Sequence, residues 1–195
     1  MNFPTSFPTL HTPRILLRSF NAGDNDLIFD LRKSDRIAQH IIRPLMTQQS
    51  AANTMLENIH SGFSQQLSIS WVGEIRHTGE VMGSCGLMNI NQADSTAEIG
   101  GEMLVSGWGK GYALEAVITI LNYAFNVLNL VQIEAKVLSS NRSAIALMTR
   151  IGFLKDSGFE QPIHHELGNG ILHRYTLLPD NFSQHLSTMQ KNQPE

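Results

Sequence analysis

A glycine-lysine-glycine turn between two regular segments constrains this chain more than any other feature. The stretch SGWGKGYALEA occupies residues 106–116 and separates strand-like alternation from an apolar run with helical spacing. The start of a helix leaves several backbone N–H groups without partners and carries partial positive charge. Gly109 and Gly111 let the backbone approach a ligand closely, and Lys110 adds a cation. The turn therefore predicts a site for a phosphate or pyrophosphate at a helix N-terminus.

Two familiar phosphate-binding motifs do not fit this turn. A Walker A loop requires Ser or Thr after its lysine, and here Gly111 follows Lys110. A dinucleotide-binding fingerprint requires a glycine three residues after Gly111, and the chain has Leu114 there. A tight glycine turn without any ligand is the alternative interpretation, and the spacing alone leaves it open.

Strand and helix signals follow one another in a single order without internal repeats. Apolar residues at helical spacing mark the helices, and alternating apolar runs separated by turn residues mark the strands. The predicted strands are 14–20, 67–76, 81–90, 96–105, 131–139 and 171–178, and the predicted helices are 21–41, 48–63, 112–128 and 141–153. With one further strand before the last, the order is β-α-α-β-β-β-α-β-α-β-β. This order predicts an α+β fold with helices on both faces of a mixed sheet.

Length and composition predict one globular domain. The chain has 195 residues, of which 42% are hydrophobic and 16% charged, and this is enough to bury a sizeable core. We expect residues 1–11 to form a flexible arm, residues 12–179 to form the domain, and residues 180–195 to form a polar, frayed tail.

Charge and cysteine usage narrow the class of protein. The formal net charge of -3 does not resemble the basic footprint of a nucleic-acid binder. No signal peptide and no apolar run of membrane-spanning length are apparent. Cys85 is the single cysteine, so no internal disulfide can form and a reducing compartment is expected. We therefore expect a cytoplasmic protein, a monomer or homodimer, that binds neither nucleic acid nor membrane.

The glycine turn resembles motif A of the GNAT acetyltransferases, Q/R-x-x-G-x-G/A. The motif corresponds to residues 108–113, with Trp108 in the Gln/Arg place, as is common in the RimJ/RimL-like branch of ribosomal-protein N-acetyltransferases. Further matches occur in family order: TPRILLR at 12–18, AEIGGEM at 97–103, YAF at 123–125, Asn141 to Ala144, and Gly152-Phe153. Together they cover most of residues 12–178.

This resemblance implies a fold and a co-substrate. It implies a mixed, mostly antiparallel sheet of about seven strands, in which the fourth and fifth strands (96–105 and 131–139) splay apart. It implies that acetyl-CoA is the co-substrate, that no metal takes part, and that the pantetheine arm lies in the gap like an added strand. The cofactor-binding residues implied are Met103, Leu104, Val105, Trp108, Gly109, Lys110, Gly111, Tyr112, Ala113 and Asn141. For Asn141 a helix N-cap is the other interpretation, and both can hold.

Acetyl transfer to an amine requires a base and a polarised carbonyl. Glu98 and Glu102 lie four apart on one predicted strand, so both face the same side, with Gly100 between them. We interpret them as the catalytic carboxylates beside a cationic amine, although solvated surface carboxylates are the alternative. Glu134 is a third candidate. Glu115 is expected to support the start of the helix electrostatically.

The chain lacks the general acids that the resemblance would supply. Many GNAT enzymes have a tyrosine seven residues after the asparagine, and here that residue is Met148. A serine that can help in the RimJ/RimL-like branch is replaced by Ala144. Because a thiol has a pKa of about 8.5, water can suffice to protonate the leaving thiolate. The histidines at 164, 165 and 173 lack metal-ligand spacing, and Cys85 has no evident catalytic partner.

Several functions remain open at the level of the sequence. The first is an N-acetyltransferase that acts on a primary amine, either a protein N-terminus or a small molecule such as a polyamine, an amino acid or an aminoglycoside. The second is a non-catalytic acyl-CoA-binding or regulatory module, which Met148 and Ala144 favour. The segments 24–63 and 159–173, in which acceptor specificity resides in the family, carry no recognisable acceptor signature.

Overall fold

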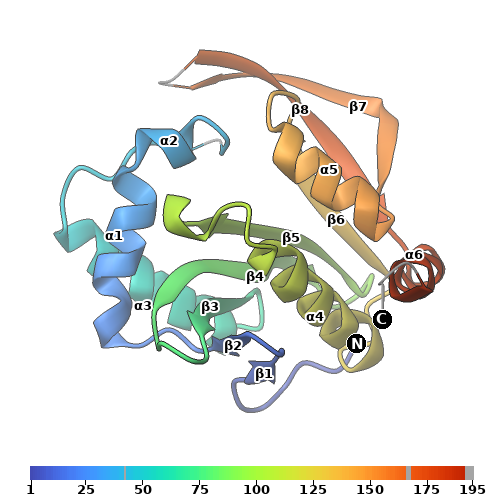
Figure 1. Ribbon diagram of the computed structural model, residues 1–195, viewed down its shortest axis with the longest axis horizontal. Helices are drawn as coiled ribbons and strands as arrows, with labels where there is room; N and C mark the ends of the chain where they lie inside the picture. Colours follow the sequence, from blue (N-terminus) through green and yellow to red (C-terminus); the bar gives the residue numbers. More distant parts are fainter. Residues whose placement is uncertain (42, 166–167, 192–195) are drawn as a thin grey trace.

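Eight strands form one open sheet whose two halves diverge in the middle (Figure 1). The computed structural model describes residues 1–41, 43–165 and 168–191. The strands are β1 (Leu10–His11), β2 (Ile15–Arg18), β3 (Ile69–Ile75), β4 (Val81–Asn91), β5 (Thr96–Met103), β6 (Gln132–Leu138), β7 (Leu154–His165) and β8 (Gly168–Leu177). Their order is β1-β2-β3-β4-β5-β6-β8-β7, and among these described strands only the neighbours β5 and β6 run parallel. The predicted mixed, mostly antiparallel sheet is confirmed, with β1 as an additional short strand.

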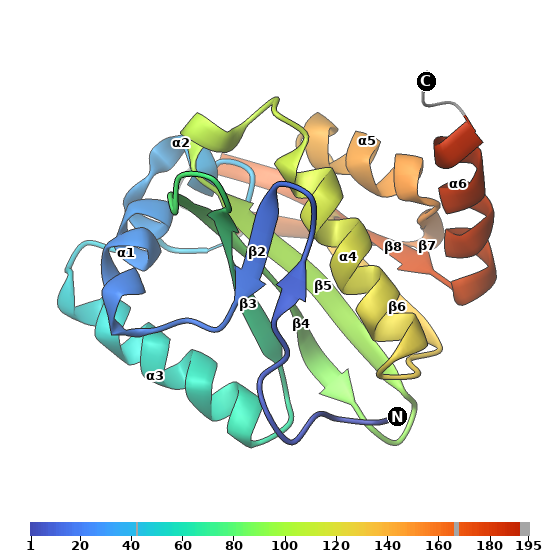
Figure 2. The same ribbon diagram turned by 60° about the horizontal axis from the view of Figure 1, so that its bottom comes forward.

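Helices cover both faces of the sheet, as the sequence predicts (Figure 2). The helices are α1 (Asn25–Lys33), α2 (Asp35–Ala38), α3 (Ser50–Ser64), α4 (Tyr112–Asn126), α5 (Arg142–Ile151) and α6 (Pro179–Lys191), with 3-10 turns at Ala22–Asp24 and Val105–Gly107. The buried residues of α1 to α3 form one core with Val72, and those of α4 and α5 form the main core. None of the described helices is long and apolar enough to cross a membrane.

The apolar stripe of α4 explains why this helix anchors the main core. Its buried side chains recur at the helical spacing and include Ala116, Val117, Ile120, Leu121 and Ala124. On the facing strand, Ala97 and Ile99 of β5 are buried against them. Each large apolar side chain that leaves water contributes about 1.5–3 kcal/mol. This packing fixes α4 against the main core of the sheet.

The single helix predicted for residues 21–41 is interrupted in the structure. Ser34 has an extended backbone (φ -79°, ψ 115°), so α1 ends at Lys33 and α2 begins after it. The guanidinium of Arg43 donates to the carbonyls of Leu31 and Arg32, at 2.8 and 2.9 Å. Arg43 thereby satisfies carbonyl groups that a continuous helix would bond internally. The apolar periodicity could not reveal this break, because it is the same on both sides.

The segments predicted as a flexible arm and a frayed tail each contain a regular element, β1 and α6, within the described residues. In the arm, β1 pairs with β2, and the indole of Trp71 donates to the Pro8 carbonyl at 2.7 Å. In the tail, α6 buries Phe182 against the ring of Phe125, with centroids 5.5 Å apart. These segments thus contain regular elements held by aromatic side chains, which the count of polar residues did not indicate. The last four residues of the predicted tail, 192–195, lie outside the described residues.

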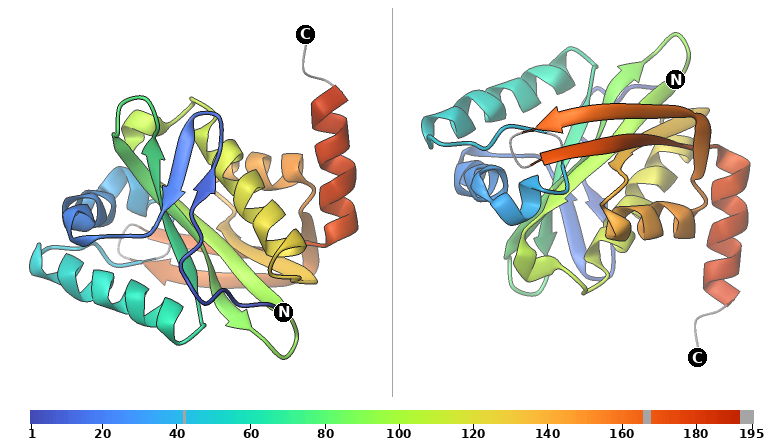
Figure 3. Two further views of the ribbon diagram at one scale, coloured as in Figure 1. Left: turned by 90° about the horizontal axis from the view of Figure 1, so that it is seen from below. Right: turned by 90° about the horizontal axis from the view of Figure 1, so that it is seen from above.

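The β7–β8 hairpin extends the fold above the open half of the sheet. Figure 3 shows it reaching from α6 toward α1 and α2. A register shift between Lys155 and Glu160 interrupts the pairing of β7 with β8. Gln161 and Leu172 of this hairpin line the same cavity as Arg32 of α1. The hairpin and the first helices thus enclose one space from opposite sides.

Candidate active site

The glycine turn leads directly into the N-terminus of α4. Gly109 and Gly111 have left-handed backbones, with φ of 74° and 79°, which glycine adopts without steric cost. Within the described part of the chain, the amides of residues 109–114 have no backbone hydrogen-bond acceptor. These free amides and the helix dipole form a site suited to an anion.

Arg14 braces this turn from the start of β2. Its Nε donates to Glu115 at 2.6 Å, and its Nη1 donates to the Lys110 carbonyl at 2.9 Å. Burial opposes ionisation of Glu115, but hydrogen bonds from Thr12 and Arg14 outweigh it and lower the pKa of the carboxyl group. Glu115 therefore supports the helix start, in keeping with the prediction. The sequence did not reveal Arg14 as a second cation at the turn, because it is 101 residues away from Glu115.

Strands β5 and β6 separate just before the glycine turn. They pair only from Thr96–Glu98 to Gln132–Glu134, so the rest of the β5 edge is open. The Leu104 amide donates to the Met82 carbonyl on the β4 side, at 2.8 Å. Because the two edges of a strand alternate, the main-chain groups of Gly101 and Met103 face the opening. This edge can receive an extended ligand as an added strand.

The predicted main-chain contacts at Met103 to Val105 are partly occupied in the structure. The Trp108 indole donates to the Met103 carbonyl at 3.0 Å. The carbonyls of Leu104 and Val105 accept from Gly107 and Trp108, at 2.9 and 3.1 Å. The open edge is therefore shifted toward Gly101 and the Met103 amide, and Trp108 fastens the turn to the strand. The sequence could not show this, since the direction of each amide depends on the register with β4.

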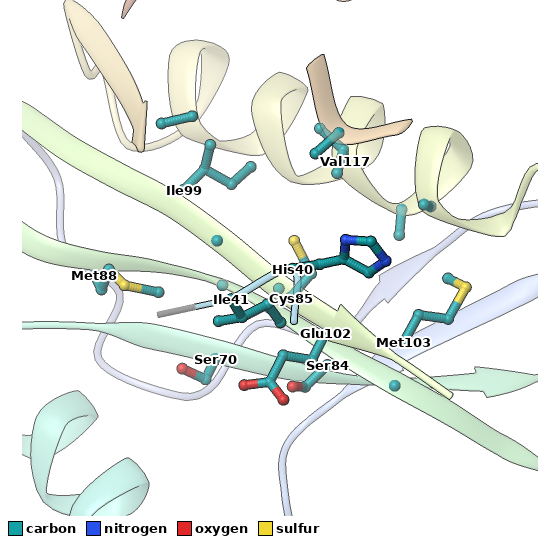
Figure 4. Close-up of a pocket in the computed structure, with 18 of the residues that line it drawn as sticks. His40, Ile41, Ser70, Ser84, Cys85, Met88, Ile99, Glu102, Met103 and Val117 are labelled. Atoms are coloured by element: carbon teal, nitrogen blue, oxygen red, sulfur yellow. The ribbon is translucent and has the colours of Figure 1, made fainter. Parts of the chain in front are cut away.

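One cavity of about 730 Å³ passes through the opening between β5 and β6. Tyr112, Ala116 and Val117 of α4 line it on one face of the sheet. Figure 4 shows Ser70, Ser84 and Glu102 on the opposite face, where Arg32 of α1 and Met55 of α3 also line it. The cavity thus connects the region of the glycine turn with the face that α1 to α3 cover.

Glu98 and Glu102 share one strand face, but each is paired with cations. No register shift occurs between them, so Glu98, Gly100 and Glu102 point the same way, as predicted. Glu98 Oε2 accepts from Lys136 at 2.7 Å and from Asn89 at 3.3 Å. Its Oε1 has no partner within the described residues.

Both carboxylate oxygens of Glu102 are paired with arginine side chains, whereas only one oxygen of Glu98 has a partner in the described part of the chain. Its Oε2 lies 2.8 Å from Arg43 Nη2 and its Oε1 lies 3.0 Å from Arg32 Nη2, and its side chain is only 8% exposed. Two guanidinium groups therefore occupy both oxygens of this carboxylate. The shared strand face of the two glutamates is as predicted, while the role of both as carboxylates beside a cationic amine stays a prediction, and each already has a cationic partner in the structure.

His40 is a cavity residue that sequence reasoning missed. Its ring lies in the cavity, 6.0 Å from the Trp108 ring, and its buried Nδ1 has no hydrogen-bond partner among the described residues (Figure 4). The His40 carbonyl accepts from Asn141 Nδ2 at 3.3 Å. Asn141 Oδ1 in turn accepts from the Ala144 amide at 3.1 Å, so Asn141 is the N-cap of α5. No periodicity or motif distinguishes His40 in the sequence.

The two residues that stand where related enzymes have a general acid both line the cavity. Met148 and Ala144 both line it, and neither carries a hydroxyl. Cys85 lies on the wall, where burial raises the pKa of its thiol to about 12, so it remains protonated at neutral pH. No group of three or more potential metal ligands occurs among the described residues.

Comparisons with known proteins agree with this geometry. Residues 14–154 match the family described as "Acetyltransferase (GNAT) domain". The chain is 34% identical over 152 residues to an uncharacterized N-acetyltransferase, p20, from Bacillus licheniformis, covering 76% of this chain and 83% of that protein. It is 29% identical over 155 residues to the uncharacterized N-acetyltransferase YoaA from Bacillus subtilis, covering 80% and 88%.

A solved structure shares the fold. The spermidine N-acetyltransferase from Vibrio cholerae, in complex with CoA and spermine, superposes with a TM-score of 0.78 at 20% identity. The match covers 88% of this chain and 99% of that structure. At this identity the likeness concerns the fold alone.

Proposed function

Because the chain belongs to the GNAT family of acetyltransferases, we propose that it transfers the acetyl group of acetyl-CoA directly to a primary amine within a ternary complex. The family establishes the N-acetyltransferase class and the acetyl-CoA co-substrate. The observation that supports the direct mechanism is the cavity, because it extends from Tyr112 and Ala113, at the start of α4, to residues on the opposite face of the sheet. Both reactants can therefore reach one point from two sides.

In this proposal the glycine turn binds the pyrophosphate. The free amides of residues 109–113, the helix dipole and the cations Lys110 and Arg14 support this placement. The pantetheine arm extends along the open edge of β5 at Gly101 and Met103. Trp108 and Asn141 hold the two sides of the opening in position, through the bonds to Met103 and His40.

The amine enters from the face that α1 to α3 cover. Its nitrogen attacks the thioester carbonyl, the amide bond forms, and the C–S bond breaks to release the thiolate. An amide N–H on β5 polarises the carbonyl oxygen. Water protonates the thiolate, since Met148 and Ala144 supply no hydroxyl at the two places considered. We propose Glu98 as the base, directly or through water, because its Oε1 is unpartnered within the described residues.

Glu102 is proposed to have a structural part and not to act as the base, because it neutralises Arg43 and holds Arg32 at the cavity.

The acceptor can be a protein N-terminal amine or a small-molecule amine. Steady-state release of CoA thiol, measured with peptides that have free N-termini and with a library of small amines, tests the proposal. Stoichiometric acetyl-CoA binding without turnover on any amine would instead indicate a non-catalytic acyl-CoA-binding module.

A further inference from the structure

The acceptor side of the cavity is mainly apolar. We call the acceptor pocket the part of the cavity that faces α1 to α3. Its apolar lining consists of Phe20, Ile41, Met55, Ile59 and Met88. Ser70 and Ser84 add two hydroxyls, and Gly86 and Gly100 leave the strand surface without side chains. Such a lining complements a molecule with an apolar body.

The carboxylates of this pocket are already neutralised. Glu98 is paired with Lys136 at 2.7 Å, and Glu102 is paired with both Arg43 and Arg32. Among the described residues that line the cavity, no other aspartate or glutamate is present. A polyamine would bring additional ammonium groups that need anionic partners, and burying an unpaired charge is costly. The pocket is therefore poorly suited to an acceptor with several positive charges.

Arg32 and Arg43 together carry one more positive charge than Glu102 compensates. Arg43 is saturated, because it donates to two carbonyls of α1 and to Glu102, and its side chain is only 7% exposed. Arg32 contacts Glu102 through Nη2 at 3.0 Å and is 28% exposed. A guanidinium has five N–H donors, and Nε and Nη1 of Arg32 have no acceptor within the described residues. This guanidinium can bind a second carboxylate.

We propose that the acceptor is a small primary amine with an apolar body and a carboxylate that binds Arg32, as in an apolar amino acid. The inference rests on the acetyltransferase function proposed above and specifies its substrate class. The apolar walls bind the body, Arg32 binds the carboxylate, and the amine is directed to the thioester. Polyamines and amines without an anionic group are poor substrates.

The test uses matched pairs of amines that differ only in the carboxylate. CoA release is measured with three pairs: L-phenylalanine and phenethylamine, L-methionine and 3-(methylthio)propylamine, and 6-aminohexanoate and pentylamine. The last pair places the carboxylate farther from the amine than the first two do. Spermidine is included as the polyamine. We expect at least one acid to exceed its partner and spermidine by tenfold or more in kcat/KM. A preference for spermidine, or equal rates within every pair, would overturn the inference.

Arg32→Gln tests the residue, and Lys33→Gln is the matched control. Lys33 follows in the same helix, is 50% exposed, and pairs with Asp30. Arg32→Gln should lower kcat/KM for the preferred acid at least tenfold, mainly through KM, and change the rate with its decarboxylated partner less than twofold. Lys33→Gln should change neither rate. Equal losses on both amines would overturn the role of Arg32, and the wild-type comparison remains decisive if the variant fails to fold.

Calorimetry with acetyl-CoA distinguishes failure of this inference from failure of the proposed function. Binding of acetyl-CoA with turnover on other amines would reject the substrate class alone. If acetyl-CoA bound but no amine were acetylated, both the substrate class and the transferase activity would be rejected. If acetyl-CoA did not bind at all, the proposed function itself would fail.

Discussion

Replacing Gly111 by glutamate tests the proposed pyrophosphate site most directly. Gly111 has a φ of 79°, and a Cβ there would lie 3.3 Å from Arg14 Nη2. A residue other than glycine in this left-handed conformation costs roughly 1–2 kcal/mol of folding free energy. For a chain of this size, that loss lowers Tm by about 2–8 °C, so the fold should survive.

The effect on the co-substrate is larger and has a separable electrostatic part. Two like charges about 4 Å apart repel by about 1 kcal/mol in water and about 4 kcal/mol at an effective dielectric constant near 20. Gly111→Glu should therefore weaken acetyl-CoA binding at least tenfold more than Gly111→Gln does, because the two side chains differ mainly in charge. Isothermal titration calorimetry at low ionic strength gives both Kd values, and 0.5 M salt should reduce their difference.

Gly79 supplies the matched control for backbone strain. It has a φ of 72°, its Cβ would meet nothing within 4 Å, and it lies in the β3–β4 turn. Gly79→Glu should therefore lower Tm by a similar amount and leave the Kd for acetyl-CoA unchanged. Equal acetyl-CoA affinity in Gly111→Glu and Gly79→Glu would refute the pyrophosphate site at the glycine turn.

Three further predictions concern the base, the bracing carboxylate and the cavity thiol. Glu98→Gln should lower kcat at least roughly 10²-fold, and His40→Gln much less; the opposite ranking in kcat would assign the base to His40 instead. Glu115→Gln should cost about 1–2 kcal/mol of unfolding free energy at pH 7. The pKa of Glu115 in the folded state lies below its usual 4.5, so this stabilisation is present above about pH 4.5 and is lost as the pH falls further. Urea denaturation of the variant and of the wild type should therefore give the same free energy of unfolding in acid. Cys85 is only partly exposed on the cavity wall, and desolvation raises the pKa of its thiol to about 12. Iodoacetamide at pH 8 should therefore modify the native thiol at least roughly tenfold more slowly than the unfolded one, and similar rates would contradict the raised pKa.

Local patterns predicted the framework of the site well. The glycine turn, the apolar stripe of α4 and the alternation of β5 are set by neighbouring residues, and the structure has each where the sequence indicated. The shared face of Glu98 and Glu102 also follows from strand geometry alone, since no bulge separates them. Such features can be deduced because their physical causes act within one or two turns of chain.

The chemistry of the site depends on contacts that the sequence does not display. Arg14 and Glu115 meet across 101 positions, and Arg43 reaches Glu102 across 59. The open groups of β5 are those of Gly101 and Met103 because the strand register with β4 decides which way each amide points. The buried Nδ1 of His40 has no hydrogen-bond partner among the described residues, and the apolar pattern gave no sign of this. Which charged side chains are paired, and which polar groups stay unpartnered, depends on tertiary contacts, and these contacts determine the charge and reactivity of the site.

Glu102 illustrates why a strand motif does not define the acceptor. An unpaired carboxylate at this position of AEIGGEM would attract a cationic amine. Here Arg43 completes the last turn of α1 and binds the same carboxylate, while Arg32 adds a charge in excess. The electrostatic sign of the pocket is therefore set by α1 and by the segment after α2, outside the strand that carries the motif. Acceptor preference can change by substitutions in those segments while the acetyl-CoA site stays intact.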